Sequence, residues 1–244
     1  MNGNIILLGE YGSVAQGTAT PDSDHDFMGI YMESPEEVIG LEETDSKRES
    51  DAKDGEKSKP GSSDTTYHTL RKFVKLAAGG NPTIGSILFL PKYETLTSTG
   101  QHLLDIRDAF VSKKAGRAYL GYMDAQINAF ARTGRKNRAD LVEQYGYDTK
   151  FGYHAYRLGI QGIQMMTLRS GPRIPMRGDT LAYANQIRAG VVPKIELMDK
   201  LAKVRENLRE SIDKSDLPDY ANKERINRFL VDEYQWYWDH GVTY

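Results

Sequence analysis

Two carboxylates separated by one residue are the strongest chemical signal in this chain. Asp24 and Asp26 follow a Gly-Ser pair, Gly12 and Ser13, that comes soon after the apolar run at residues 5–8. In a β-strand, residues two apart point to the same face, so these carboxylates would converge on one point. Mg²⁺ prefers oxygen ligands and is commonly held by one or two carboxylates together with substrate phosphates. A Gly-Ser turn allows close backbone approach and offers a hydroxyl, so the pattern predicts metal-dependent phosphate transfer.

The stretch Gly12–Asp26 (GSVAQGTATPDSDHD) places ten residues between Ser13 and Asp24. A Gly-Ser pair, a spacer of this length and Asp-x-Asp resemble the active-site motif of polymerase-beta-type nucleotidyltransferases. The following FMGIY and two later blocks, Asp64–Phe89 and Tyr145–Leu158, are similar to the RNA-repair-pathway branch of that superfamily, which is common in bacteria and phages. The blocks occur in the expected order over most of residues 1–240.

The resemblance implies an α+β fold, in which a small polymerase-beta-like palm with a mixed sheet precedes an α-helical C-terminal portion. We expect a nucleotidyltransferase catalytic domain over residues 1–95 and an α-helical domain over 96–244. The implied activity is Mg²⁺-dependent (or Mn²⁺-dependent) transfer of NMP from an NTP to a hydroxyl acceptor, with release of pyrophosphate. The expected acceptor is an RNA end, tRNA included. ATP binding is expected, although the pocket that selects the base cannot be read from the sequence.

The resemblance also implies roles for individual residues. Asp24 and Asp26 would hold the metal ion and Gly12 and Ser13 the nucleotide phosphates. Asp64 would be the third carboxylate, completing the metal site and orienting or deprotonating the attacking hydroxyl. That role requires the strand of Asp64 to lie beside the strand of Asp26.

Simpler interpretations of the same carboxylates stay open. Asp is common in polar turns and at element caps, which would explain Asp24, Asp26 and Asp64 without chemistry. His25, between the first two, is expected to point to the opposite face and is assigned no role. If the Asp64 register is wrong, other acids of the preceding loop could replace it: Asp51, Asp54 and Glu56.

Basic residues form two further candidate sites. Lys150, His154 and Arg157 are spaced i, i+4, i+7, so one helix face would carry all three. Their block resembles the second signature of the branch, which implies nucleotide binding; an RNA backbone or a merely solvated face are the alternatives. A denser run could contact a polynucleotide or form a solvated loop: Arg132, Arg135, Lys136 and Arg138.

The remaining pattern gives the elements that must position these residues. Strands are expected at 4–8, 26–32 and 64–70, and the polar segment 42–63 is expected to be a mobile loop or a polar hairpin. Helices are expected near 70–78, 99–110, 113–133, 148–169, 179–189, 194–213 and 221–237. The helix at 194–213 should turn one apolar stripe to the core: Ile195, Met198, Leu201, Val204, Leu208 and Ile212.

Composition limits the classes of function. The 244 residues are 39% hydrophobic and 27% charged, which is typical of a globular protein of one large or two small domains. The chain has no cysteine, which excludes disulfides and thiolate metal sites. No apolar run approaches membrane-spanning length, and a cytoplasmic location without membrane contact is expected. The net charge of −2 argues against nonspecific coating of nucleic acid but permits a local basic patch.

Two other functions use the same parts. Nucleotidylation of a protein, such as AMPylation, would need the same metal and phosphate ligands. A non-catalytic, antitoxin-like nucleotide-binding module would keep the fold without turnover. The presence of all three expected carboxylates favours an enzyme.

Overall fold

The computed structural model describes residues 4–21, 23–41, 46–50, 61–131, 139–168 and 170–240. The chain divides into two compact units. The first comprises Met1–Gly79, Thr83–Phe110 and Ala221–Tyr244, and the second comprises Gly80–Pro82 and Val111–Tyr220. In this division the C-terminal segment Ala221–Tyr244 lies in the same unit as the strands, and the expected domain boundary after residue 95 stays a prediction.

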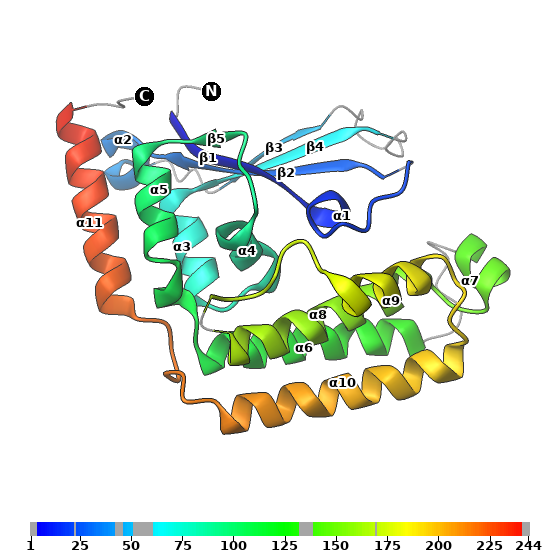
Figure 1. Ribbon diagram of the computed structural model, residues 1–244. Helices are drawn as coiled ribbons and strands as arrows, with labels where there is room; N and C mark the ends of the chain where they lie inside the picture. Colours follow the sequence, from blue (N-terminus) through cyan, green and yellow to red (C-terminus); the bar gives the residue numbers. More distant parts are fainter. Residues whose placement is uncertain are drawn as a thin grey trace. The chain divides into compact units, whose positions relative to one another are not determined.

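The first unit is built on a five-stranded mixed sheet (Figure 1). Its strand order is β3-β4-β2-β1-β5, with β2 and β4 parallel and the other pairs antiparallel. The α+β fold with a mixed sheet and C-terminal helices is thus confirmed. The strands are β1 (Asn4–Tyr11), β2 (His25–Met32), β3 (Ser46–Ser50), β4 (Ser63–Thr69) and β5 (Thr95–Leu96).

Helix α3 (Leu70–Ala78) begins directly after β4 and covers the sheet. The side chain of Thr69 accepts a hydrogen bond from the backbone N–H of Lys72, which caps the first turn. Leu70 and Phe73 are completely buried on the face that packs against β2 and β4. The switch from strand to helix at residue 70 therefore holds β4 in place beside β2.

The other helices of this unit complete the layer around the sheet. Helix α11 (Lys223–His240) packs on α3 and α5, and its Tyr234 Oη donates a hydrogen bond to the buried carboxylate of Glu33 just after β2. Trp238 Nε1 donates to the Glu33 carbonyl at 3.1 Å. These contacts explain why the last helix belongs to the sheet unit. The remaining helices are α1 (Gly12–Ala15), α2 (Pro35–Ile39), α4 (Pro82–Ser86), η1 (Ile87–Phe89), α5 (Ser98–Asp105) and η2 (Arg107–Phe110).

The second unit is helical in the part that the structure describes. Helices α6, α8 and α10 pack on one another, and α7 and α9 flank α8 (Figure 1). A side chain at Gly159 would place its Cβ 2.4 Å from Val204 Cγ1, so the glycine permits the close approach of α8 and α10. The helices are α6 (Lys113–Ala131), α7 (Ala139–Tyr145), α8 (Thr149–Thr167), α9 (Gly178–Arg188) and α10 (Lys194–Lys214).

One packing expectation for α10 is wrong in its first two turns. Ile195 is 77% exposed and Met198 is 49% exposed, whereas Leu197 is completely buried. The buried stripe therefore starts at Leu197 and continues through Leu201 to Ile212, because the N-terminal end of α10 turns Leu197 to the other helices.

In its described part, the polar segment 42–63 agrees with the polar hairpin, one of the two expected alternatives. Residues 46–50 form the edge strand β3, antiparallel to β4. All five residues of the strand are polar, as suits an edge that faces water. Residues 42–45 and 51–60 lie outside the described residues. Among the residues that are described, no helix combines the length and the apolar character needed to cross a membrane.

Candidate active site

The carboxylates of Asp26 and Asp64 lie on neighbouring strands in direct register. Asp26 of β2 pairs with Asp64 of the parallel strand β4, and Tyr11 at the end of β1 pairs with Asp26 from the other side. Residues in direct register on neighbouring strands share a face of the sheet. The expected neighbourhood of the Asp26 and Asp64 strands is therefore confirmed, and the two acids meet near the ends of three strands.

Asp24 reaches this place from the loop before β2. It lies one residue outside the strand and is exposed, so it is not held by strand pairing. The Ser62 hydroxyl donates a hydrogen bond to Asp24 Oδ1 at 3.2 Å, and the His25 N–H donates to the Ser62 carbonyl at 2.8 Å. These bonds connect the segments leading into β2 and β4, which brings Asp24 to the same end of the sheet as Asp26 and Asp64.

The electrostatics of the two paired acids differ. Burial raises the pKa of Asp26, and the charges of Asp24 and Asp64 raise it further. By contrast, hydrogen bonds from Ser50 and Arg48 lower the pKa of Asp64. A bound cation would therefore offset the negative charge that is crowded around Asp26. Asp64, in contrast, is ionised more readily than Asp26.

Gly12 contributes space and backbone geometry. Its φ of +69° lies in the left-handed region that favours glycine. A Cβ at this position would lie 2.5 Å from Asp26 Oδ2, too close for any side chain without a shift of the carboxylate. The turn continues into α1, where the Ser13 carbonyl accepts a hydrogen bond from the Thr18 N–H at 2.9 Å. Gly12 therefore lies against Asp26, and the phosphate-binding role of Gly12 and Ser13 stays a prediction.

Arg48 was not predicted as a site residue. It projects from β3 and donates a hydrogen bond from Nη2 to Asp64 Oδ2 at 2.7 Å, while its side chain remains 69% exposed. Arg48 lies in the polar segment, where charges alternate in sign and nothing in the sequence distinguishes one position from the others. Only the pairing of β3 with β4 reveals it.

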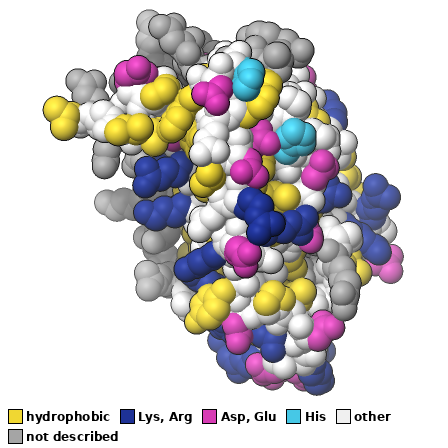
Figure 2. Space-filling model, turned by 90° about the vertical axis from the view of Figure 1, so that its left-hand side faces the viewer, with side chains coloured by type: hydrophobic (Ala, Val, Ile, Leu, Met, Phe, Trp, Pro, Cys, Tyr) yellow, Lys and Arg dark blue, Asp and Glu magenta, His cyan; other side chains and the backbone are white. Residues whose placement is uncertain are grey.

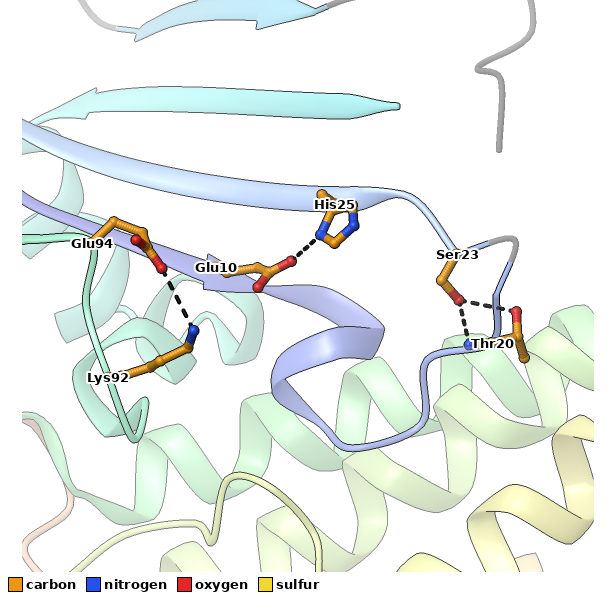
Figure 3. A network of polar contacts seen from close by, with 6 residues as sticks. All are labelled: Glu10, Thr20, Ser23, His25, Lys92 and Glu94. Carbon is orange, nitrogen blue, oxygen red and sulfur yellow. Dashed lines mark hydrogen bonds and ion pairs between the residues drawn. The ribbon is translucent and has the colours of Figure 1, made fainter. Parts of the chain in front are cut away.

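His25 points away from the paired acids, as expected. Its Nδ1 lies 2.5 Å from Glu10 Oε1, and Figure 3 shows this pair between β2 and β1. Neighbouring strand residues alternate between faces, so His25 lies on the face opposite Asp26. The same view includes a looser ion pair between Lys92 and Glu94, 3.7 Å apart.

The donor chemistry of the acidic site fits a hard divalent cation. Asp24, Asp26 and Asp64 offer only carboxylate oxygens, the type of ligand that Mg²⁺ and Mn²⁺ prefer. Over the described residues, no three or more His, Cys, Asp or Glu side chains are arranged as a ready metal site. One or two of these carboxylates with substrate phosphates would suffice for Mg²⁺.

The predicted basic residues of α8 lie together in the second unit. Lys150 is exposed, and His154 and Arg157 are partly exposed on the same side of the helix. Arg157 Nη1 donates to Gln161 Oε1 at 3.0 Å, which fixes the direction of its guanidinium. Their role in nucleotide binding stays a prediction. The other candidates fall outside the described residues: Asp51, Asp54, Glu56, Arg132, Arg135, Lys136 and Arg138.

Comparison with known proteins identifies the family. A phage T4 protein, the uncharacterized 38.9 kDa protein of the nrdC-mobD intergenic region of Enterobacteria phage T4, is 27% identical over 137 residues. That match covers 54% of this chain and 40% of the phage protein, so the chain spans less than half of that relative's length. The family model of the RNA repair pathway DNA polymerase beta family matches residues 1–232. The chain therefore belongs to the RNA repair pathway DNA polymerase beta family.

Proposed function

We propose that this protein transfers a nucleoside monophosphate from an NTP to a hydroxyl acceptor and releases pyrophosphate. In this reaction the acceptor oxygen forms a bond to the α-phosphorus as the bond to the pyrophosphate oxygen breaks. Asp24 and Asp26, with Asp64, would hold Mg²⁺ or Mn²⁺, which offsets the charge on the phosphates. Gly12 and Ser13 would cradle the phosphates through backbone N–H groups and the Ser hydroxyl.

The observation that carries the proposal is the register of Asp26 with Asp64 beside Gly12. Asp64, whose pKa is lowered by hydrogen bonds from Ser50 and Arg48, would ligate the metal and orient or deprotonate the acceptor hydroxyl. Positioning and charge stabilisation account for most of the rate in phosphate transfer, and no covalent intermediate on the protein is required.

The proposed acceptor is an RNA end, tRNA included, and the proposed nucleotide is ATP. The description of the family, which names an RNA repair pathway, supports RNA as the acceptor. The many charged residues and the absence of cysteine agree with the proposed cytoplasmic location.

The test is a transfer assay with each α-³²P-labelled NTP, Mg²⁺ or Mn²⁺, and a cell lysate that supplies the acceptors. We expect label in RNA with the wild type, and a loss on the order of 100- to 1,000-fold in Asp24→Ala or Asp26→Ala. Separation of RNA from protein on a denaturing gel identifies the acceptor class.

Asp232→Asn is the matched control, because Asp232 is an exposed acid of α11 in the same unit. It should transfer at the wild-type rate. If the label appears on protein and not on RNA, the proposed reaction changes from transfer to RNA to nucleotidylation of a protein. Full activity of an Asp24→Ala/Asp26→Ala double variant would overturn the assignment of the site.

A further inference from the structure

The second unit contains a segment with a strong local excess of positive charge. From residue 149 to residue 194 the sequence has seven Lys or Arg residues and a single acid, Asp179. The whole chain has 32 basic and 34 acidic residues, so this excess is local. The segment comprises α8, the connection from α8 to α9, and α9.

The fold places two of these cations, Lys150 and Arg157, along one side of α8. Residues 150, 154, 157, 161 and 164 follow the i, i+4, i+7, i+11, i+14 spacing of one helix face. At the end of that row, Gln164 Oε1 accepts a hydrogen bond from the backbone N–H of Arg173 at 2.9 Å. The connection between α8 and α9 therefore begins by returning along α8, and Figure 1 shows it running back beside this helix before α9 begins.

The connection exposes its charges and buries its apolar residues. Ile174 and Met176 are buried, with exposed fractions of 7% and 1%, whereas Arg173 and Arg177 are exposed. The alternation anchors the backbone of the connection and directs both guanidinium groups outward. We call Lys150, Arg157, Arg173 and Arg177 the basic strip.

Within the described residues, the cations of the strip form no ion pairs. No carboxylate of the described part of the chain lies within ion-pair distance of Lys150, Arg157, Arg173 or Arg177. On α10 of the same unit, charges do pair.

Three ion pairs involve α10: Arg205 with Asp124, Arg209 with Glu206, and Lys214 with Glu210. The face of the molecule in Figure 2, which includes α11, likewise has acidic and basic side chains interspersed. Arg205, Arg209 and Lys214 thus have acidic partners, which the four strip residues lack within the described part of the chain.

We propose that the basic strip binds the phosphate backbone of a single-stranded RNA, the acceptor of the transfer reaction. Lys150 and Arg157 are separated by about 10 Å along the helix axis, and the connection adds the exposed Arg173 and Arg177. A polynucleotide can contact all four cations at once, and its affinity grows with each phosphate contact.

The geometry also supports multiple contacts of moderate strength. Arg guanidinium groups form bidentate hydrogen bonds to phosphate, and three of the four strip residues are Arg. Gln161, completely buried, holds the Arg157 side chain in a fixed direction, so less freedom is lost when it binds. The naming of RNA as the acceptor rests on the proposed function, whereas binding itself can be measured without catalysis.

The test measures binding of a fluorescent single-stranded 20-nucleotide RNA of mixed sequence, without NTP or divalent metal, at a series of salt concentrations. The variant is Arg173→Gln/Arg177→Gln, because both side chains are exposed and their removal leaves the core intact. We expect weaker binding, and a salt slope of log K that is shallower by about 1.4, since each lost single-strand phosphate contact removes about 0.7. Binding of ATP should stay unchanged.

Arg209→Gln/Lys214→Gln is the matched control, since it removes two cations of the same unit that pair with acids. Equal loss of RNA binding in this control would overturn the proposal, because total charge alone would then explain the effect. Unchanged RNA binding in Arg173→Gln/Arg177→Gln, with or without a loss of ATP binding, would also overturn it.

The same assay separates this inference from the proposed function. The Asp26→Ala variant should bind the RNA as the wild type does. If RNA binding depends on the strip but the wild type transfers no nucleotide, the RNA-binding role of the strip is supported and the proposed enzymatic activity is contradicted. If transfer to RNA occurs but Arg173→Gln/Arg177→Gln binds RNA and transfers normally, the proposed activity is supported and the RNA-binding role of the strip is contradicted.

Discussion

The acidic sheet edge of the first unit and the basic strip of the second unit hold unbalanced charge in different ways. At the sheet edge, strand register fixes Asp26 beside Asp64, and burial adds to the repulsion that raises the pKa of Asp26. On the strip, helix periodicity spaces Lys150 and Arg157 along α8, where water screens them from one another. One arrangement concentrates charge at a point and the other distributes it along a line.

The difference corresponds to two kinds of ligand. A point of converging oxygen atoms suits a small divalent cation, whose affinity depends on close ligand geometry. A line of partly solvated cations suits a polyanion, whose affinity grows with the number of phosphates contacted and falls with salt. Elsewhere, for example at Arg205 and Asp124, opposite charges pair and stabilise the fold without leaving an open site.

Among the variants that leave all three carboxylates in place, the largest effect on transfer is expected from Gly12→Ala. The substitution puts Cβ into the space of Asp26 Oδ2 and forces a side chain into a left-handed backbone conformation. We expect transfer to fall by about 100-fold, because displacing a reacting group by about 1 Å has that order of effect. The strained backbone should also lower the free energy of unfolding by about 1–2 kcal/mol. Single-turnover kinetics and urea unfolding measure the two effects.

The Gly146→Ala variant separates the effect of backbone strain from the effect of displacing the Asp26 carboxylate. Gly146 has a φ of +76°, and nothing lies within 4 Å of the position that its Cβ would take. This variant should lose similar stability and keep its transfer rate. A Gly12→Ala variant as active as Gly146→Ala would show that Asp26 needs no fixed position, and the contrast between a point and a line of charge would fail.

A smaller effect is expected on stability at the same edge. Because the folded pKa of Asp26 lies above its ordinary value of 3.8, the folded state binds more protons than the unfolded state above that pH. The free energy of unfolding therefore decreases as pH rises from about 3.8 through the raised pKa. Asp26→Asn should remove this decrease and make the metal-free protein more stable at pH 7. Urea unfolding at pH 4 and pH 7 measures it.

The strip supplies the comparison for that experiment. Arg173→Gln/Arg177→Gln should leave stability at pH 7 nearly unchanged, because both side chains are exposed. A loss of stability at pH 7 in Asp26→Asn would mean that the Asp26 carboxylate stabilises the fold, as a structural residue does.

The sequence predicted which carboxylates lie together better than it predicted the residues around them. The spacing of Gly12, Asp24 and Asp26 predicted that these residues lie close together. The family resemblance added Asp64 to the same predicted site. The Asp26–Asp64 register could not be read from the residues, because β4 pairs with β2 only after a long polar segment. Arg48 could not be found for the same reason, since its contact depends on β3 pairing with β4.

Packing expectations were limited by what periodicity can resolve. The 3.6-residue pattern located the helices and most of their core residues, Leu201 and Leu208 among them. It could not distinguish Leu197 from its neighbours Ile195 and Met198, because all three are apolar and lie within one turn. Which of them is buried depends on where the other helices end.

Binding of Mn²⁺ at the sheet edge tests the central claim most directly. Titration of Mn²⁺ in the presence of a non-hydrolysable ATP analogue, followed by electron paramagnetic resonance, counts the bound ion without any acceptor or turnover. We predict that the wild type and Arg173→Gln/Arg177→Gln bind Mn²⁺ together with the nucleotide, and that Asp26→Asn binds it at least tenfold more weakly. Equal Mn²⁺ binding by Asp26→Asn and the wild type would contradict the account.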